Sequence, residues 1–144
     1  MKQLIENELL DILCGKISSA INRAILRNFV KENIDITTEQ WTVMACLWNK
    51  DKVTQQTLCT ITEKDKPSIT RLLDKLESRN YVVRVQDPTD RRINLIHLTE
   101  AGTALQKKAT EIVEQVANKT LSNITEEELN LSREVLRKII KNLK

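Results

Sequence analysis

Glycine and proline are scarce in this sequence of 144 residues, which contains two of each. Because these residues mark many tight turns, their scarcity indicates a mainly helical chain. The sequence also lacks a glycine-rich phosphate loop, and its single histidine, His97, has no cluster of further metal ligands. No candidate nucleophile is accompanied by a histidine base. We therefore expect no enzyme activity, no metal and no cofactor.

Cysteines and long apolar runs are also rare. The three cysteines, Cys14, Cys46 and Cys59, are widely spaced and form no CxxC pair, so neither a disulfide scaffold nor structural zinc is expected. Each is interpreted as a small core hydrophobe. No stretch has the length of a membrane span, and Glu6 and Glu8 lie where a secretion signal would be apolar. A cytoplasmic protein without a membrane partner is therefore expected.

The composition is that of a globular protein, with 40% hydrophobic and 30% charged residues. A chain of this length is sufficient for one core but not for two independent ones. Residues 1–144 are therefore predicted to form a single domain. The net charge of +3 permits nucleic-acid binding without indicating it.

The most informative stretch begins at residue 65. Its apolar residues recur at the spacing of an amphipathic helix, namely Ile69, Leu72, Leu73 and Leu76. Asp65 and Pro67 are typical of a helix start. The other face carries hydrogen-bond donors and cations, namely Lys66, Ser68, Thr70, Arg71 and Lys75. This face suits the base edges and phosphates of double-stranded DNA, although Asp74 interrupts it.

Two apolar runs follow this helix, at residues 81–85 and 93–98, and a polar turn-forming segment separates them. They predict a two-stranded hairpin with Arg91 and Arg92 at its tip. A helix that enters the major groove, joined to a hairpin whose arginines reach the minor groove, defines a winged helix-turn-helix. The alternative is a solvated helix face and an exposed turn with an ordinary surface ion pair. We favour DNA binding because the two arginines have no evident structural role.

The same residues resemble the MarR (multiple antibiotic resistance regulator) family of bacterial transcription factors. The resemblance is carried by Asp87-Pro88-Thr89-Asp90-Arg91-Arg92 and by the following Leu98-Thr99-Glu100-Ala101-Gly102, and it extends more loosely over almost the whole chain. It implies that Arg92 enters a minor groove and that Asp90 orients its side chain. Asn80 stands where many family members have glycine, and asparagine also tolerates a left-handed turn.

The resemblance has three further implications. It implies a homodimer built from both termini, and a small-molecule effector, often aromatic or anionic, that enters between the dimerisation and DNA-binding parts. It also raises the alternative of redox sensing through Cys14. Sensors of that kind pair the thiol with tyrosines, whereas Tyr81 is the only tyrosine here, so burial of Cys14 is preferred.

The remaining segments are predicted to be helical. Apolar periodicity covers residues 8–32, Thr37 opens a second helix, and Thr54 opens a third that ends near Thr62. Two more helices begin at Thr99 and Thr125. The second helix is expected to be mostly core, with an apolar stripe of Trp41, Met44, Ala45 and Trp48. The third has the apolar residues Leu58, Cys59 and Ile61, and the last is expected to turn five residues inward: Leu129, Leu136, Ile139, Ile140 and Leu143. Residues 36–98 would form the DNA-binding part, and residues 1–35 and 99–144 the dimerisation helices.

These observations predict a mainly α fold with a small β-hairpin wing. The predicted function is a sequence-specific, DNA-binding transcriptional regulator, a ligand-responsive repressor that binds a pseudo-palindromic operator as a homodimer. The residues expected to contact or support DNA are Lys66, Ser68, Thr70, Arg71, Lys75, Asp90, Arg91 and Arg92. A winged-helix protein-interaction module, or a redox-sensing regulator that uses Cys14, is the alternative.

Overall fold

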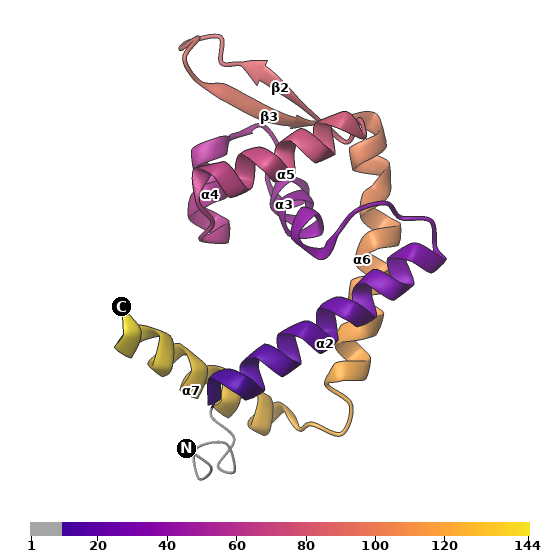
Figure 1. The fold of residues 1–144 in the computed structure, drawn as a ribbon, viewed down its shortest axis with the longest axis vertical. Coiled ribbons are helices and arrows are strands. Elements are labelled where there is room, and N and C mark those ends of the chain that lie inside the picture. The colour runs from indigo at the N-terminus through magenta and orange to yellow at the C-terminus, as the bar shows by residue number, and fades with distance from the viewer. Residues whose placement is uncertain (1–9) are drawn as a thin grey trace.

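A computed structural model describes residues 10–144 of the chain. Its elements, in order, are α2 (Leu10–Lys31), α3 (Thr38–Asn49), β1 (Val53–Thr54), α4 (Gln55–Thr62), α5 (Lys66–Ser78), β2 (Val82–Gln86), β3 (Asn94–Leu98), α6 (Glu100–Thr120) and α7 (Glu126–Leu143). Figure 1 shows α3, α4, α5 and the strands gathered at one end of the molecule, with α6 running from the wing to the other end, where α7 begins. Helix α2 packs across α6.

Five side chains at the predicted helix starts cap the helices. Each side chain accepts a hydrogen bond from the backbone N–H three residues later, at Thr37, Thr54, Asp65, Thr99 and Thr125. These caps satisfy donors that a helix leaves free in its first turn. Asn80 has a φ of 60°, the left-handed conformation expected directly after α5. The sequence predictions of these helix boundaries are therefore confirmed.

The core lies mainly in the part of the chain that carries the strands. The predicted stripe of α5 is confirmed, because Ile69, Leu73 and Leu76 are fully buried and Leu72 is partly buried. Helix α2 adds Ile25 and Phe29, and α6 adds three small or branched side chains, Ala109, Ile112 and Val116. The core thus extends along α6 as far as Val116. Helix α5 packs on α3, α4 and β2.

The sheet has three strands rather than the predicted two. Val53 pairs with Ile96 and Thr54 with Leu95, which gives the antiparallel order β1-β3-β2. A strand of two residues is too short to show alternation in the sequence, which explains why it was missed. The extra strand ties the start of α4 to the hairpin.

Helices α3 and α4 bury their apolar residues unequally. Ile61 is 59% exposed, because α4 buries Leu58 and Cys59 on its other side. In α3, the deepest side chains are Val43, Met44 and Leu47, whereas Trp41, Ala45 and Trp48 are only partly buried.

Helix α7 differs most from the prediction. None of its residues is buried in the single chain, and Leu136, Ile140 and Leu143 are 42%, 53% and 82% exposed. Its amphipathic pattern is real, but within residues 10–144 no other element covers its apolar face.

Candidate nucleic-acid interface

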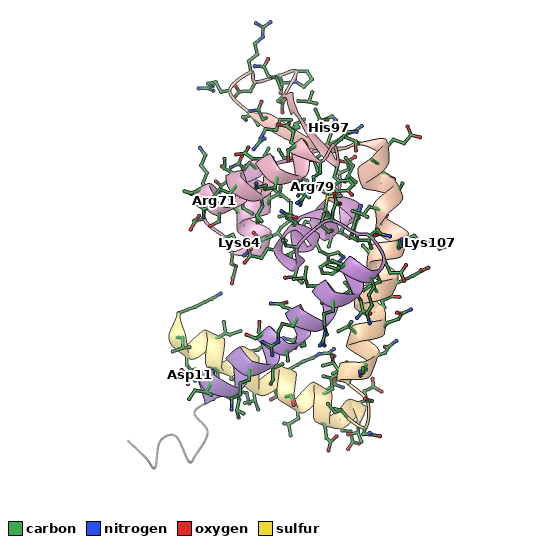
Figure 2. The ribbon with its side chains drawn as sticks, turned by 45° about the vertical axis from the view of Figure 1, so that its right-hand side comes forward. Asp11, Lys64, Arg71, Arg79, His97 and Lys107 are labelled. Carbon is green, nitrogen blue, oxygen red and sulfur yellow. The ribbon has the colours of Figure 1, made fainter. Side chains whose placement is uncertain are left out.

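The five predicted residues of α5 lie on the side of the helix that faces away from the core. Lys66, Arg71 and Lys75 are exposed, and Ser68 and Thr70 are partly buried. Figure 2 shows Arg71 at the outer surface of α5. The guanidinium of Arg71 donates a hydrogen bond to the Ser68 hydroxyl at 3.4 Å. This long and exposed contact leaves the cation available to an approaching polyanion.

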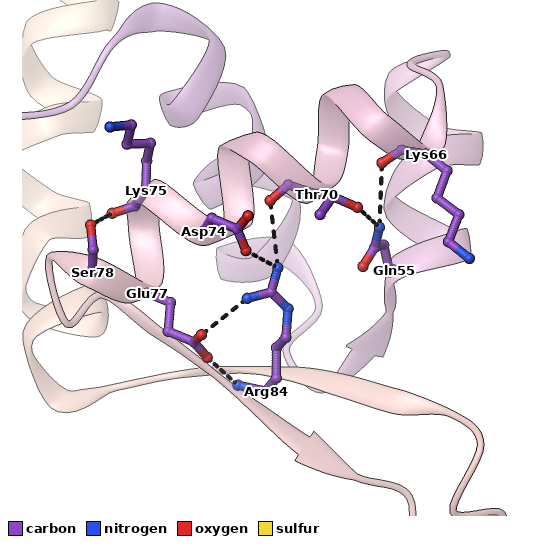
Figure 3. Close-up of polar contacts among 8 residues, drawn as sticks. All are labelled: Gln55, Lys66, Thr70, Asp74, Lys75, Glu77, Ser78 and Arg84. Atoms are coloured by element: carbon purple, nitrogen blue, oxygen red, sulfur yellow. Dashed lines mark hydrogen bonds and ion pairs between the residues drawn. The ribbon is translucent and has the colours of Figure 1, made fainter.

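Arg84, on β2, is a site residue that sequence reasoning missed. Its guanidinium contacts Asp74 at 2.7 Å and Glu77 at 3.0 Å, and its backbone N–H donates to the Glu77 carboxylate at 3.1 Å (Figure 3). Two carboxylates of α5 that would repel a phosphate are therefore paired. A signal existed in the sequence, since strand alternation places Arg84 on the same face as the buried Val82.

The wing tip is organised by two aspartates. The Asp87 carboxylate accepts hydrogen bonds from the backbone N–H and the hydroxyl of Thr89, and these bonds lower the pKa of Asp87. The carboxylate of Asp90 accepts two bonds from the Arg92 guanidinium and one from its backbone N–H, each at 3.1 Å. The Arg92 side-chain bond is the main cause of the lowered pKa of Asp90. The aspartate–arginine contact implied by the resemblance is present.

The wing and the start of α5 bound one concave surface. Lys66 and Arg92 line the same cavity, of about 340 Å³, together with Gln55 and Asn94. The side chain of Arg92 is 90% exposed there. Cations from two elements, separated by 26 positions in the sequence, therefore face one space. Arg91 is also exposed.

The remaining candidate residues lie elsewhere. Cys14 is exposed on α2, so the prediction that it is buried is wrong for the single chain. Cys59 is buried as expected, and Cys46 is partly buried, which raises the pKa of its thiol. His97 lies on β3. Within residues 10–144, no group of three or more His, Cys, Asp or Glu side chains is placed to hold a metal ion. None of the described helices is both long and apolar enough to span a membrane.

Comparison with known proteins gives a consistent set of relatives. Residues 36–93 match the sequence model of the MarR family. The HTH-type transcriptional regulator SarZ of Staphylococcus aureus is 33% identical over 117 residues, which cover 81% of this chain and 72% of SarZ. The S. aureus MepR–DNA complex superposes with a TM-score of 0.86 at 26% identity, over 93% of this chain and 98% of MepR. A mutant MarR from E. coli complexed with operator DNA gives a TM-score of 0.84 at 25% identity, over 94% of this chain and 96% of that MarR chain.

Proposed function

The chain belongs to the MarR family of transcriptional regulators, and we propose that it represses transcription by binding a pseudo-palindromic DNA operator as a homodimer. The observation that carries this proposal is the shared concave surface of Lys66 and Arg92, which joins the start of α5 to the wing. DNA presents its phosphates on both sides of a groove, so a cationic helix and a cationic wing can engage neighbouring grooves. Its place of action would be the cytoplasm.

In this arrangement, α5 lies in the major groove. Arg71 is long enough to donate two hydrogen bonds to guanine O6 and N7, a pairing worth roughly 1–3 kcal/mol of discrimination. Lys66 and Lys75 would contact phosphates on either side, since nine residues of helix separate them by about 14 Å. Arg92, oriented by Asp90, would enter a narrow minor groove, where negative potential is concentrated.

The dimer is supported by the exposed apolar side chains of the terminal helices. On α2 these include Ile17 and Leu26, and on α7 they include Leu131 and Ile140. Contact between two copies would remove this surface from water and hold two winged parts at a fixed distance. The expected half-sites lie about 34–36 Å apart, one turn of DNA.

Release from DNA by a small molecule belongs to the same proposal. A groove of about 470 Å³ between α2 and α6 combines apolar walls from Ile17, Ile21 and Val116 with the cations Arg27 and Lys119. The apolar walls suit an aromatic ring, and the two cations suit an anionic group on the same ligand. Such a ligand would change DNA affinity only if it bound one arrangement of the two halves more tightly than the other.

The test is a salt titration of purified protein on a selected operator and on a random duplex. We expect affinity to fall steeply with salt on both, with tighter binding to the operator. Arg71→Ala should relax base preference, whereas Arg91→Ala and Arg92→Ala should weaken binding to all sequences. Lys107→Ala, which removes an exposed cation from α6 (Figure 2), is the matched control and should bind normally. Binding to neither duplex, or no salt dependence, would favour a protein-interaction module instead.

A redox-sensing regulator is the second candidate, favoured by the exposed thiol of Cys14. In that case peroxide should weaken operator binding by the wild-type protein and by Cys59→Ser, but not by Cys14→Ser. Equal loss in all three proteins would reject Cys14 as the sensor.

A further inference from the structure

Gln55, the first residue of α4, contacts α5 from the side. Its amide Nε2 donates to the Thr70 hydroxyl oxygen at 2.6 Å, and the same nitrogen lies 3.4 Å from the backbone carbonyl oxygen of Lys66 (Figure 3). A carbonyl oxygen can only accept a hydrogen bond, so the amide atom between these two oxygens must be the donating nitrogen. The hydroxyl of Thr70 therefore accepts from Gln55.

Other helical threonines of the chain behave differently. In four of them the hydroxyl donates back to the carbonyl oxygen four residues earlier, at 2.6–3.1 Å: Thr42, Thr60, Thr62 and Thr120. At Thr70 the corresponding carbonyl is that of Lys66, which lies beside the Gln55 amide instead. One lone pair of the Thr70 hydroxyl is thus occupied while its proton has no acceptor within residues 10–144.

We propose that Gln55 is a positioning residue that fixes Thr70 as a hydrogen-bond donor to a base edge in the major groove. The inference rests on the proposed function, in which the exposed side of α5 faces DNA. It requires a base with an acceptor opposite Thr70. Guanine offers O6 and N7, adenine offers N7 and thymine offers O4, whereas cytosine presents only the amino donor at N4. Cytosine offers the Thr70 proton no acceptor, so it is the base that the wild-type protein should disfavour at this position.

The hydrogen-bond direction can be reversed by one substitution. In Gln55→Glu, the carboxylate can only accept, so the Thr70 proton turns toward it and a lone pair faces the groove. The variant should then tolerate cytosine, whose amino group donates. In Gln55→Leu, neither direction is imposed, and the Thr70 proton can return to the Lys66 carbonyl, as in the other threonines.

The experiment is selection of bound sequences from a random duplex library by the full-length wild-type protein and by four variants. Thr70→Val should lose about tenfold discrimination at one position of each half-site, and Gln55→Leu should lose it at that same position only. Gln55→Glu should admit cytosine there. Gln56→Glu adds the same charge beside Gln55 and should weaken binding evenly, with the base profile unchanged. Circular dichroism would verify folding, and Gln55→Met would replace a leucine variant that does not fold.

The outcomes separate this inference from the function on which it rests. If the wild-type protein selects no sequence, the proposed function fails and the inference fails with it. The inference alone is overturned if the wild-type protein selects an operator but Gln55→Leu keeps the base discrimination at the position where Thr70→Val loses it. The inference is also overturned if Gln55→Glu and Gln56→Glu give the same base profile.

Discussion

The winged part of the chain, residues 36–98, buries most of its apolar side chains within one protomer, whereas the terminal helices leave many of theirs exposed. Leu58, Leu73 and Ile96 have no exposed surface, while Leu131 and Leu143 are 62% and 82% exposed. The first group gains its full transfer free energy on folding of one chain, and the second can gain it only on association. The winged part is therefore stabilised by the core of its own chain, to which α2 and α6 also contribute, whereas the exposed apolar residues of the terminal helices would gain stability only from a partner.

The two regions meet where α6 leaves the wing. The indole N–H of Trp48 donates to the Gly102 carbonyl at 2.9 Å, and the backbone N–H of Thr99 donates to the Tyr81 carbonyl at 3.1 Å. The Tyr81 hydroxyl donates to Asp35, on the segment between α2 and α3. These bonds fix the direction of α6 relative to α5. A change in the helices at one end can thus be transmitted to α5 at the other.

The largest contrast is expected between two leucines. Leu73→Ala removes a fully buried side chain, and we expect it to lower the free energy of unfolding by about 2–5 kcal/mol. Leu143→Ala removes an exposed one and should change the stability of the monomer by less than about 0.5 kcal/mol. Urea denaturation at protein concentrations below the dimer dissociation constant measures both. A large cost for Leu143→Ala under those conditions would mean that α7 is held by its own chain.

The next contrast is between the two glycines. A Cβ at Gly102 would overlap the backbone carbonyl of Tyr81, whereas a Cβ at Gly15 would meet nothing within 4 Å. Because backbone cannot move aside cheaply, Gly102→Ala should cost about 1–3 kcal/mol. Gly15→Ala should stabilise α2 by roughly 0.5–1 kcal/mol through helix propensity. Thermal unfolding of both variants tests this. Destabilisation by Gly15→Ala at high concentration only would place that residue in a dimer contact.

The junction can be followed through its single tyrosine. Burial, and then the hydrogen bond to Asp35, raise the pKa of Tyr81 from 10.0 to about 12. Because the folded pKa is raised, the contribution of Tyr81 to stability is complete below pH 10 and is lost as pH rises through 12. Ionised tyrosine absorbs ultraviolet light at a longer wavelength than neutral tyrosine. The rise of this absorbance with pH reports Tyr81 alone, since the chain has one tyrosine. Asp35→Asn should lower the midpoint of the tyrosine titration, and Asp11→Asn, at an exposed position of α2, should leave it unchanged.

Much of the fold is predictable from the sequence because its signals are local. A capping threonine or aspartate acts on the N–H three residues later, so Thr37, Asp65 and Thr125 mark helix starts whatever lies around them. Burial is less local. Ile61 shares the apolar spacing of Leu58 but lies on the open side of a short helix. The pattern of α7 indicates an apolar face, which the structure shows exposed in the single chain.

The contacts of the candidate site are also of two kinds, those within a short motif and those between separate elements. Asp90 and Arg92 are two residues apart, and their contact is implied by a motif in the sequence. Arg84 meets Asp74 across 10 positions, and Gln55 meets Thr70 across 15. Pairs of this second kind arise only when helices and strands pack together, so periodicity within one element does not reveal them. The sequence therefore indicates the predicted DNA contacts but not the residues that support them.

The smallest effect on stability is expected at the wing tip, where the effect on DNA binding should be large. Arg92 and Asp90 form an ion pair in which the arginine side chain is 90% exposed, and such surface pairs contribute little to folding because solvent screens them. Arg92→Ala should therefore leave the melting temperature unchanged while weakening operator affinity, which fluorescence anisotropy would measure alongside thermal unfolding. Lys107→Ala should change neither quantity. A drop in melting temperature with Arg92→Ala would show that the tip supports the fold, and its arginine would then have a structural role that needs no DNA.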